Sequence, residues 1–122
     1  MEKRKSYRYE SVEKLKGKLY NVVNFNVKNI SYEGINIICG FITKIGTVYN
    51  IYLSKNEEKK DFKIKIIRSE AQPFEDKHED LSSKGMLYNV GAEFVDLNEE
   101  RKEFLKYIIN DENNLDGALL ID

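Results

Sequence analysis

The stretch that decides the fold is residues 22–39, which read VVNFNVKNISYEGINIIC. Its first half alternates, because Val23, Phe25 and Val27 are separated by polar residues. A period of two is typical of a β-strand with one buried face. After a short polar turn, residues 35–43 are apolar almost throughout and bounded by glycines, which predicts a strand with both faces covered. The stretch therefore predicts two strands joined by a tight hairpin connection.

Similar strand patterns occur further along the chain, at residues 49–53, 62–66 and 86–95. The charged segment 55–60 between the first two predicts a solvated hairpin turn. Residues 71–85 have no periodicity and hold the single proline, so a long loop or an irregular connection is expected there. Several antiparallel strands with short turns predict a mainly β fold, and closing them into a small barrel removes their exposed edges.

A helix is predicted after the last of these strands. Asn98 is a good N-cap, and Glu99 and Glu100 favour the positive end of the helix dipole. An apolar stripe at helical spacing then runs to about Asn110. We expect this helix to cover one open end of the barrel.

The sequence divides into three parts. Residues 1–16 are charged with scattered apolar residues, and they predict an N-terminal arm or loop. Residues 17–110 hold the barrel and its helix. Residues 111–122 are expected to form a C-terminal tail whose apolar side chains are able to dock on the barrel or on a partner; these are Leu115, Leu119, Leu120 and Ile121.

The composition limits the classes of protein. The chain has 122 residues, of which 41% are hydrophobic and 34% charged, and its formal net charge is −1. These values are typical of one soluble domain, and the lack of a basic excess argues against a duplex DNA binder. No apolar run suits a signal peptide or a membrane span, so a cytoplasmic location without membrane insertion is expected. The single cysteine, Cys39, lies in an apolar run and predicts a buried hydrophobic residue.

The sequence contains no recognisable catalytic constellation, so neither an enzymatic activity nor a cofactor is expected. His78 is the only histidine and lies in a charged segment, which favours a solvated side chain over a metal ligand or a base. There is no phosphate-binding loop of the Walker type and no Cys-x-x-Cys pair. The carboxylates are scattered, and no acid–base pair stands out among them.

Two short motifs are candidates for binding, and the first is a pair of arginines near the N-terminus. Arg4 and Arg8 stand four residues apart, beside Lys3, in a chain that has few arginines. A guanidinium binds phosphate through two parallel hydrogen bonds and stacks on a base, which an ammonium cannot do. The plainer interpretation is a solvated basic terminus.

The second motif is the turn Asn29-Ile30-Ser31-Tyr32-Glu33-Gly34. Asn29 and Ser31 offer short polar side chains at the end of a strand, and Gly34 permits either a positive φ or a close backbone approach. Taken alone, the motif is explained by ordinary turn chemistry, in which Asn and Ser bond to their own backbone. The two motifs in this order are more specific together than either is alone.

In these residues the sequence resembles the PilZ domain family, which is marked by an N-terminal RxxxR and, after the first long strand, by [D/N]xSxxG. Residues 4–8 match the first pattern and residues 29–34 the second. Residues 90–97, followed by a charged helix, look like the last strand and closing helix of the family. The resemblance covers residues 3–109, although 40–85 match only in strand pattern. It implies a six-stranded antiparallel split β-barrel of the PilZ type with a C-terminal α-helix.

The resemblance also implies a ligand, the bacterial second messenger cyclic di-GMP. The arginines would contact its phosphates and stack on guanine, and the asparagine would accept from guanine nitrogens. The serine would hydrogen-bond the ligand, and the glycine would let the backbone come close. Because asparagine has one acceptor oxygen where aspartate has two, weaker binding is expected. The residues carried over are Lys3, Arg4, Arg8, Asn29, Ser31 and Gly34.

Such a protein would be a receptor. Binding of cyclic di-GMP would order the arm and signal to a separate protein, in motility, envelope polysaccharide export or pilus assembly. The alternative is a PilZ-like adaptor that binds another protein and no nucleotide. A further alternative is an oligonucleotide-binding barrel, which the near-neutral charge disfavours, so no nucleic acid partner is expected. The side chains able to stack on bases there are Tyr7, Tyr9, Tyr20, Tyr49 and Tyr52.

Overall fold

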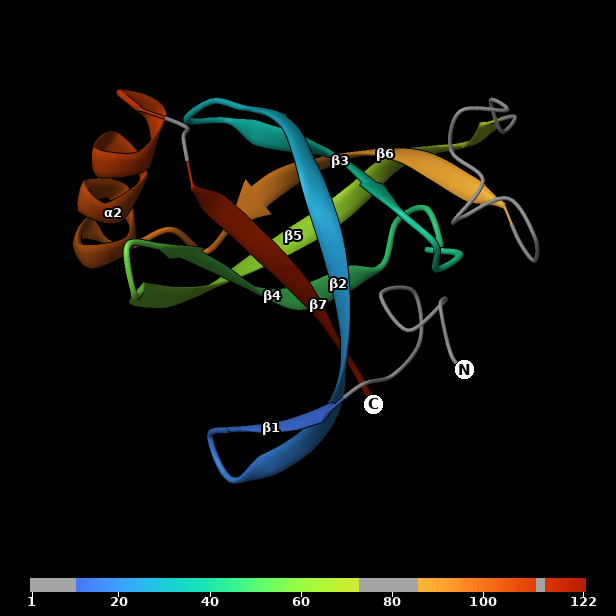
Figure 1. Ribbon diagram of the computed structural model, residues 1–122, viewed down its shortest axis with the longest axis horizontal. Helices are drawn as coiled ribbons and strands as arrows, with labels where there is room; N and C mark the ends of the chain where they lie inside the picture. The colour runs from blue at the N-terminus through green and yellow to red at the C-terminus, as the bar shows by residue number, and fades with distance from the viewer. Residues whose placement is uncertain (1–10, 73–85, 112–113) are drawn as a thin grey trace.

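The computed structural model describes residues 11–72, 86–111 and 114–122, and these residues form a closed antiparallel β-barrel (Figure 1). The strand order is β1-β2-β3-β6-β5-β4-β7, and β7 also pairs with β2, so the six strands β2 to β7 close on themselves. The mainly β barrel with a helix near the C-terminus is therefore confirmed. The strands are β1 (Ser11–Leu15), β2 (Lys18–Ile30), β3 (Gly34–Cys39), β4 (Val48–Lys55), β5 (Glu58–Gln72), β6 (Leu87–Val95) and β7 (Leu115–Ile121).

The interior of the barrel is filled by the alternate residues that the sequence patterns predict. Ile51 and Leu53 of β4 are fully buried, as are Phe62, Ile64 and Ile66 of β5. Each such side chain contributes roughly 1.5–3 kcal/mol relative to an exposed one. A hairpin turn between these strands is confirmed, but it is limited to Asn56 and Glu57, because Lys55 pairs with Glu58 and residues 58–60 belong to β5. Lys55, expected to be solvated, is buried.

The helix α2 (Glu99–Ile109) lies against one end of the barrel, as Figure 1 shows. Its N-cap is Asn98, whose Oδ1 accepts from the backbone N–H of Arg101 at 2.8 Å. Phe104 and Leu105 are buried, and the ring of Phe104 lies 6.1 Å from that of Phe62 inside the barrel. The predicted cap, boundaries and position of this helix are therefore confirmed.

The segment expected to be a tail is a strand of the barrel. β7 pairs with β2 through Asn21–Phe25 and with β4 through Asn50–Lys55. Leu119 is fully buried at its centre. Without β7, the edges of β2 and β4 would be left unpaired, and this is the physical reason why the segment joins the sheet. The barrel therefore extends past the boundary at residue 110 that the sequence suggested.

The first residues described also differ from the expected arm. β1 forms a hairpin with β2, in which Ser11 pairs with Val22 and Leu15 with Lys18. The two turn residues, Lys16 and Gly17, have φ of 54° and 83°, which suits the tight turns of twisted hairpins. The first part of β2 is longer than the barrel requires, and β1 pairs with this overhang. The expectation of an arm is therefore wrong for residues 11–15, and residues 1–10 lie outside the described residues.

The apolar segment 35–43 is shorter as a strand than its composition suggests. β3 ends at Cys39, and its residues alternate between buried and half-buried positions. One face is therefore fully covered, and the expectation of two covered faces is wrong. Ile42 and Ile45 lie in the connection to β4 with exposed fractions of 67% and 63%. In the segment expected to be irregular, β5 continues to Gln72, and residues 73–85 lie outside the described part.

Candidate functional site

The turn between β2 and β3 is held by the side chain of Ser31. Its Oγ accepts from the backbone N–H groups of Glu33 and Gly34, at 3.2 and 3.3 Å. The N–H of Ser31 donates to the carbonyl of Gly34 at 2.9 Å and closes the turn. Three hydrogen bonds within four residues fix the backbone, so the motif forms a preorganised corner on the surface of the barrel.

Gly34 serves a close backbone approach, and not a positive φ. It pairs with Glu93 of β6, and a Cβ at position 34 would overlap the carbonyl oxygen of Ala92. The N–H of Phe94 also donates to the carbonyl of Glu33 at 3.0 Å, which ties the turn to the same strand. The sequence allowed either a positive φ or a close backbone approach for Gly34, and the structure shows the close backbone approach.

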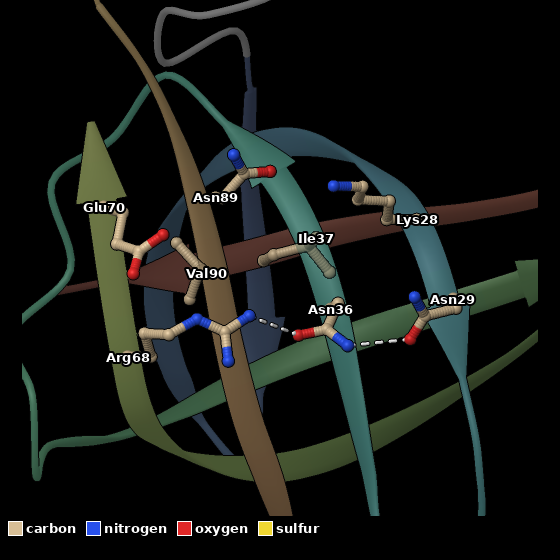
Figure 2. Close-up of a pocket in the computed structure, with 8 residues that line it drawn as sticks. All are labelled: Lys28, Asn29, Asn36, Ile37, Arg68, Glu70, Asn89 and Val90. Carbon is tan, nitrogen blue, oxygen red and sulfur yellow. Dashed lines mark hydrogen bonds between the residues drawn. The ribbon is translucent and has the colours of Figure 1, made fainter. Parts of the chain in front are cut away.

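Asn29 belongs to a chain of side-chain hydrogen bonds that the sequence did not predict (Figure 2). Its Oδ1 accepts from Nδ2 of Asn36 at 2.7 Å. Oδ1 of Asn36 in turn accepts from Nη2 of Arg68 at 3.1 Å. A cation on β5 is thereby connected to the turn motif on β2.

The strand register explains how these residues meet. Asn29 pairs with Asn36, Asn36 pairs with Gly91, and Gly91 pairs with Arg68. The four positions form one line across β2, β3, β6 and β5, and we call them the polar row. A Cβ on Gly91 would lie 3.0 Å from Oδ1 of Asn36 and 3.1 Å from Nη1 of Arg68. The glycine therefore leaves room for the arginine to cross β6.

Two β-bulges turn the ends of the polar row outward. The register shifts between Val27 and Asn29 in β2, and between Ile66 and Arg68 in β5. Because side chains alternate along a strand, regular pairing would turn Arg68 toward the same face as the buried Ile66. The extra residue of each bulge reverses the alternation, and both Asn29 and Arg68 are exposed.

Two hollows among the described residues flank the polar row, with volumes of about 210 and 330 Å³. Both are lined by Asn29, Asn36 and Arg68. Ligand pockets typically hold roughly 300–1,000 Å³, so the smaller hollow lies below this range and the larger one is at its lower end. The smaller hollow is also lined by Lys28, Glu70 and Asn89, and the larger one by Ser31, Glu33 and Glu93.

One buried polar atom in the smaller hollow has no partner among the described residues. Oδ1 of Asn89 is excluded from solvent and accepts no hydrogen bond there. Leaving such an acceptor unpaired costs about 1–3 kcal/mol, so a donor at this position is favoured. Figure 2 shows Asn89 and Lys28 on either side of β3, with their polar ends turned toward one another.

The sequence-predicted site residues fall into two groups. Asn29, Ser31 and Gly34 lie together at the end of β2 and the start of β3, as the motif requires. Lys3, Arg4 and Arg8 lie outside the described residues. Asn36 and Arg68 were missed, although a polar residue inside the apolar run 35–43 was a signal for the first of them. The sequence pattern gave no indication that Arg68 belongs to the site, because its side chain faces outward only as a result of the bulge in β5.

The described residues also bear on chemistry away from this face. Cys39 is buried and burial raises the pKa of its thiol, while its Sγ donates to the carbonyl of Phe41 at 3.3 Å. Across residues 11–72, 86–111 and 114–122, His, Cys, Asp and Glu side chains form no group of three or more that could hold a metal. His78 lies outside these residues. No helix in the described part is long and apolar enough to span a membrane.

Comparison of the chain with family models, with curated proteins and with solved structures gave no match.

Proposed function

We propose that this protein is a cyclic di-GMP receptor that binds its ligand over the polar row and the turn Asn29–Gly34, beneath the N-terminal arm. The observation that supports this most is that the polar row holds Arg68 in line with the turn motif. A guanidinium beside a fixed turn with short polar side chains suits a nucleotide that carries both phosphates and purine edges.

The charges of this face favour a binding mode that uses the arm. Two cations, Lys28 and Arg68, line the two hollows together with three carboxylates, Glu33, Glu70 and Glu93. Cyclic di-GMP carries two negative charges, and this balance gives it no net attraction. Arg4 and Arg8, with Lys3 beside them, would supply the missing positive charge, so the arm is expected to be required for binding.

The register of β1 is compatible with such an arm. Ser11 pairs with Val22 in an antiparallel hairpin, so the N-terminal end of β1 points along β2 toward Asn29. Asn29 is seven residues beyond Val22, a distance of about 23 Å in a strand. Arg4 is seven residues before Ser11, and an extended chain of that length spans about the same distance.

The arm and the barrel face together would act as a switch. One hollow is below the size range of ligand pockets and the other is at its lower end, so we expect the arm to close over a dinucleotide that binds there. An ordered arm would present a new surface to a separate protein, at an entropic cost that the phosphate contacts have to exceed. This role involves no covalent chemistry.

Isothermal titration calorimetry with cyclic di-GMP tests this function. We expect the wild-type chain to bind, and Arg4→Ala and Arg8→Ala each to weaken binding by about tenfold or more, since each removes charge-assisted hydrogen bonds worth roughly 1.5–3 kcal/mol. Lys106→Ala, on the exposed face of α2, removes one positive charge away from the site and should bind like the wild type. Equal binding by all four proteins would refute the site. No binding by the wild type would favour an adaptor that recognises only protein.

A further inference from the structure

The polar row has a hydrogen-bond direction, and Arg68 sets it. A guanidinium has donors and no acceptor, so the atom of Asn36 that faces it has to be the amide oxygen. The amide nitrogen of Asn36 then faces Asn29 and donates to its Oδ1 at 2.7 Å. The orientation of both amides is thus fixed by one cation two strands away from Asn36.

Asn29 is where this direction matters for a ligand. Its oxygen is turned toward Asn36 and uses one of its two lone pairs there, so the group turned away from the polar row is Nδ2, which carries two donor hydrogens (Figure 2). Ser31 is constrained in the same sense. Its Oγ already accepts two backbone N–H groups, so its remaining capacity is to donate its own hydrogen.

We infer that Arg68 is a positioning residue that makes Asn29 and Ser31 read hydrogen-bond acceptors on the ligand. This inference rests on the proposed function and specifies which edge of the ligand the turn contacts. Guanine presents the acceptors O6 and N7 on one edge and N–H donors at N1 and N2 on another. Asn29 donates to O6, to N7 or to a phosphate oxygen, and this role replaces the expectation that it accepts from the guanine nitrogens.

The donor edge of guanine has other partners on this face. Glu70 lines the smaller hollow, and Glu33 and Glu93 line the larger one. A carboxylate accepts from two adjacent N–H groups more readily than a single amide oxygen does. A preference of the whole protein for guanine is therefore compatible with a donating Asn29, and the test has to isolate the contribution of position 29.

The inosine analogue of the ligand, cyclic di-IMP, isolates that contribution. It keeps O6 and N7 and lacks only the amino group at position 2. The measured quantity is the ratio of the affinities for cyclic di-GMP and cyclic di-IMP. Because Asn29 does not contact the amino group in this account, Asn29→Ala should weaken both complexes and leave the ratio unchanged within about twofold.

Asn36→Asp should reverse the row. An aspartate accepts from Arg68 and cannot donate to Asn29, so Asn29 has to turn its Nδ2 inward and its Oδ1 toward the ligand. The affinity ratio should then rise about threefold to tenfold, the value of one added neutral hydrogen bond to the amino group. The double variant Asn36→Asp/Asn29→Ala should lose this rise, which separates the effect of the amide from that of the new charge.

The experiment combines calorimetry of both nucleotides with NMR of the asparagine side-chain amides in the unliganded protein. In the wild type and in Arg68→Lys, which keeps a group with donors only, the protected amide should be that of Asn36. In Arg68→Met, protection should be shared between Asn36 and Asn29. A threefold or larger fall of the ratio in Asn29→Ala, or a protected Asn29 amide in the wild type, would overturn the inference. Loss of all nucleotide binding by the wild type would instead refute the proposed function, and the NMR result would still decide the direction of the row.

Discussion

At the scale of single residues, two glycines of β3 and β6 have different tasks although both lie at the candidate site. Gly34 allows a backbone contact, because a Cβ would overlap the carbonyl oxygen of Ala92. Gly91 allows a side-chain contact, because a Cβ would press on the ends of Asn36 and Arg68. The first contact is part of the fold, whereas the second is part of the polar row.

This difference predicts separable effects. Gly91→Ala should displace the flexible end of Arg68, weaken cyclic di-GMP binding by about tenfold, and change the stability by less than about 1 kcal/mol. Gly34→Ala should destabilise the protein by more than that, because backbone has to move. Urea unfolding and calorimetry on both variants measure these effects. Unchanged affinity in Gly91→Ala would show that the polar row does not serve the ligand.

At the scale of the elements, the C-terminal strand decides whether the barrel closes. Leu119 of β7 is fully buried between β2 and β4, whereas Asp116 of the same strand is exposed. Leu→Ala substitutions in cores cost about 2–5 kcal/mol, a large part of the 5–15 kcal/mol by which such domains are stable. We therefore expect Leu119→Ala to lower the free energy of unfolding by about 2–5 kcal/mol.

The matched variant on the same strand is Asp116→Ala, which should change the free energy of unfolding by no more than about 0.5 kcal/mol. Urea denaturation followed by circular dichroism compares the two. If Leu119→Ala were as mild as its control, residues 111–122 would be a dispensable tail after all, and the closure of the barrel by β7 would be wrong.

The elements that sequence patterns predicted well are those with a clean period. Residues 49–53 and 62–66 alternate, and the helix after Asn98 has a cap and an apolar stripe. Interactions between residues close in sequence were therefore enough to predict these two strands and the helix. β1 and β7 were missed because short strands carry weak patterns, and pairing with other strands stabilises them, β1 with β2 and β7 with both β2 and β4. The bulges before Asn29 and Arg68 depend on strand register, which no local pattern specifies.

At the scale of the whole molecule, the barrel is a rigid frame on which the site is assembled from separate parts of the chain. The turn motif comes from one hairpin, Arg68 from another, and Gly91 from the strand between them. The sequence therefore predicted the turn motif, but not the polar row that connects it to Arg68. In the proposed function, residues 1–10 would add the positive charge that this face lacks, so ligand binding would need these residues as well as the barrel.

The measurement that tests the central claim most directly is chemical-shift mapping of the wild-type chain with cyclic di-GMP. The largest amide shifts should cluster at residues 31–34 and at Asn36, Arg68 and Gly91, with those of residues 4–8 changing in the same titration. Residues of α2 should shift little. Shifts centred on α2 or on the β1–β2 hairpin, or no shifts at millimolar ligand, would contradict the proposal that this face of the barrel is a cyclic di-GMP site.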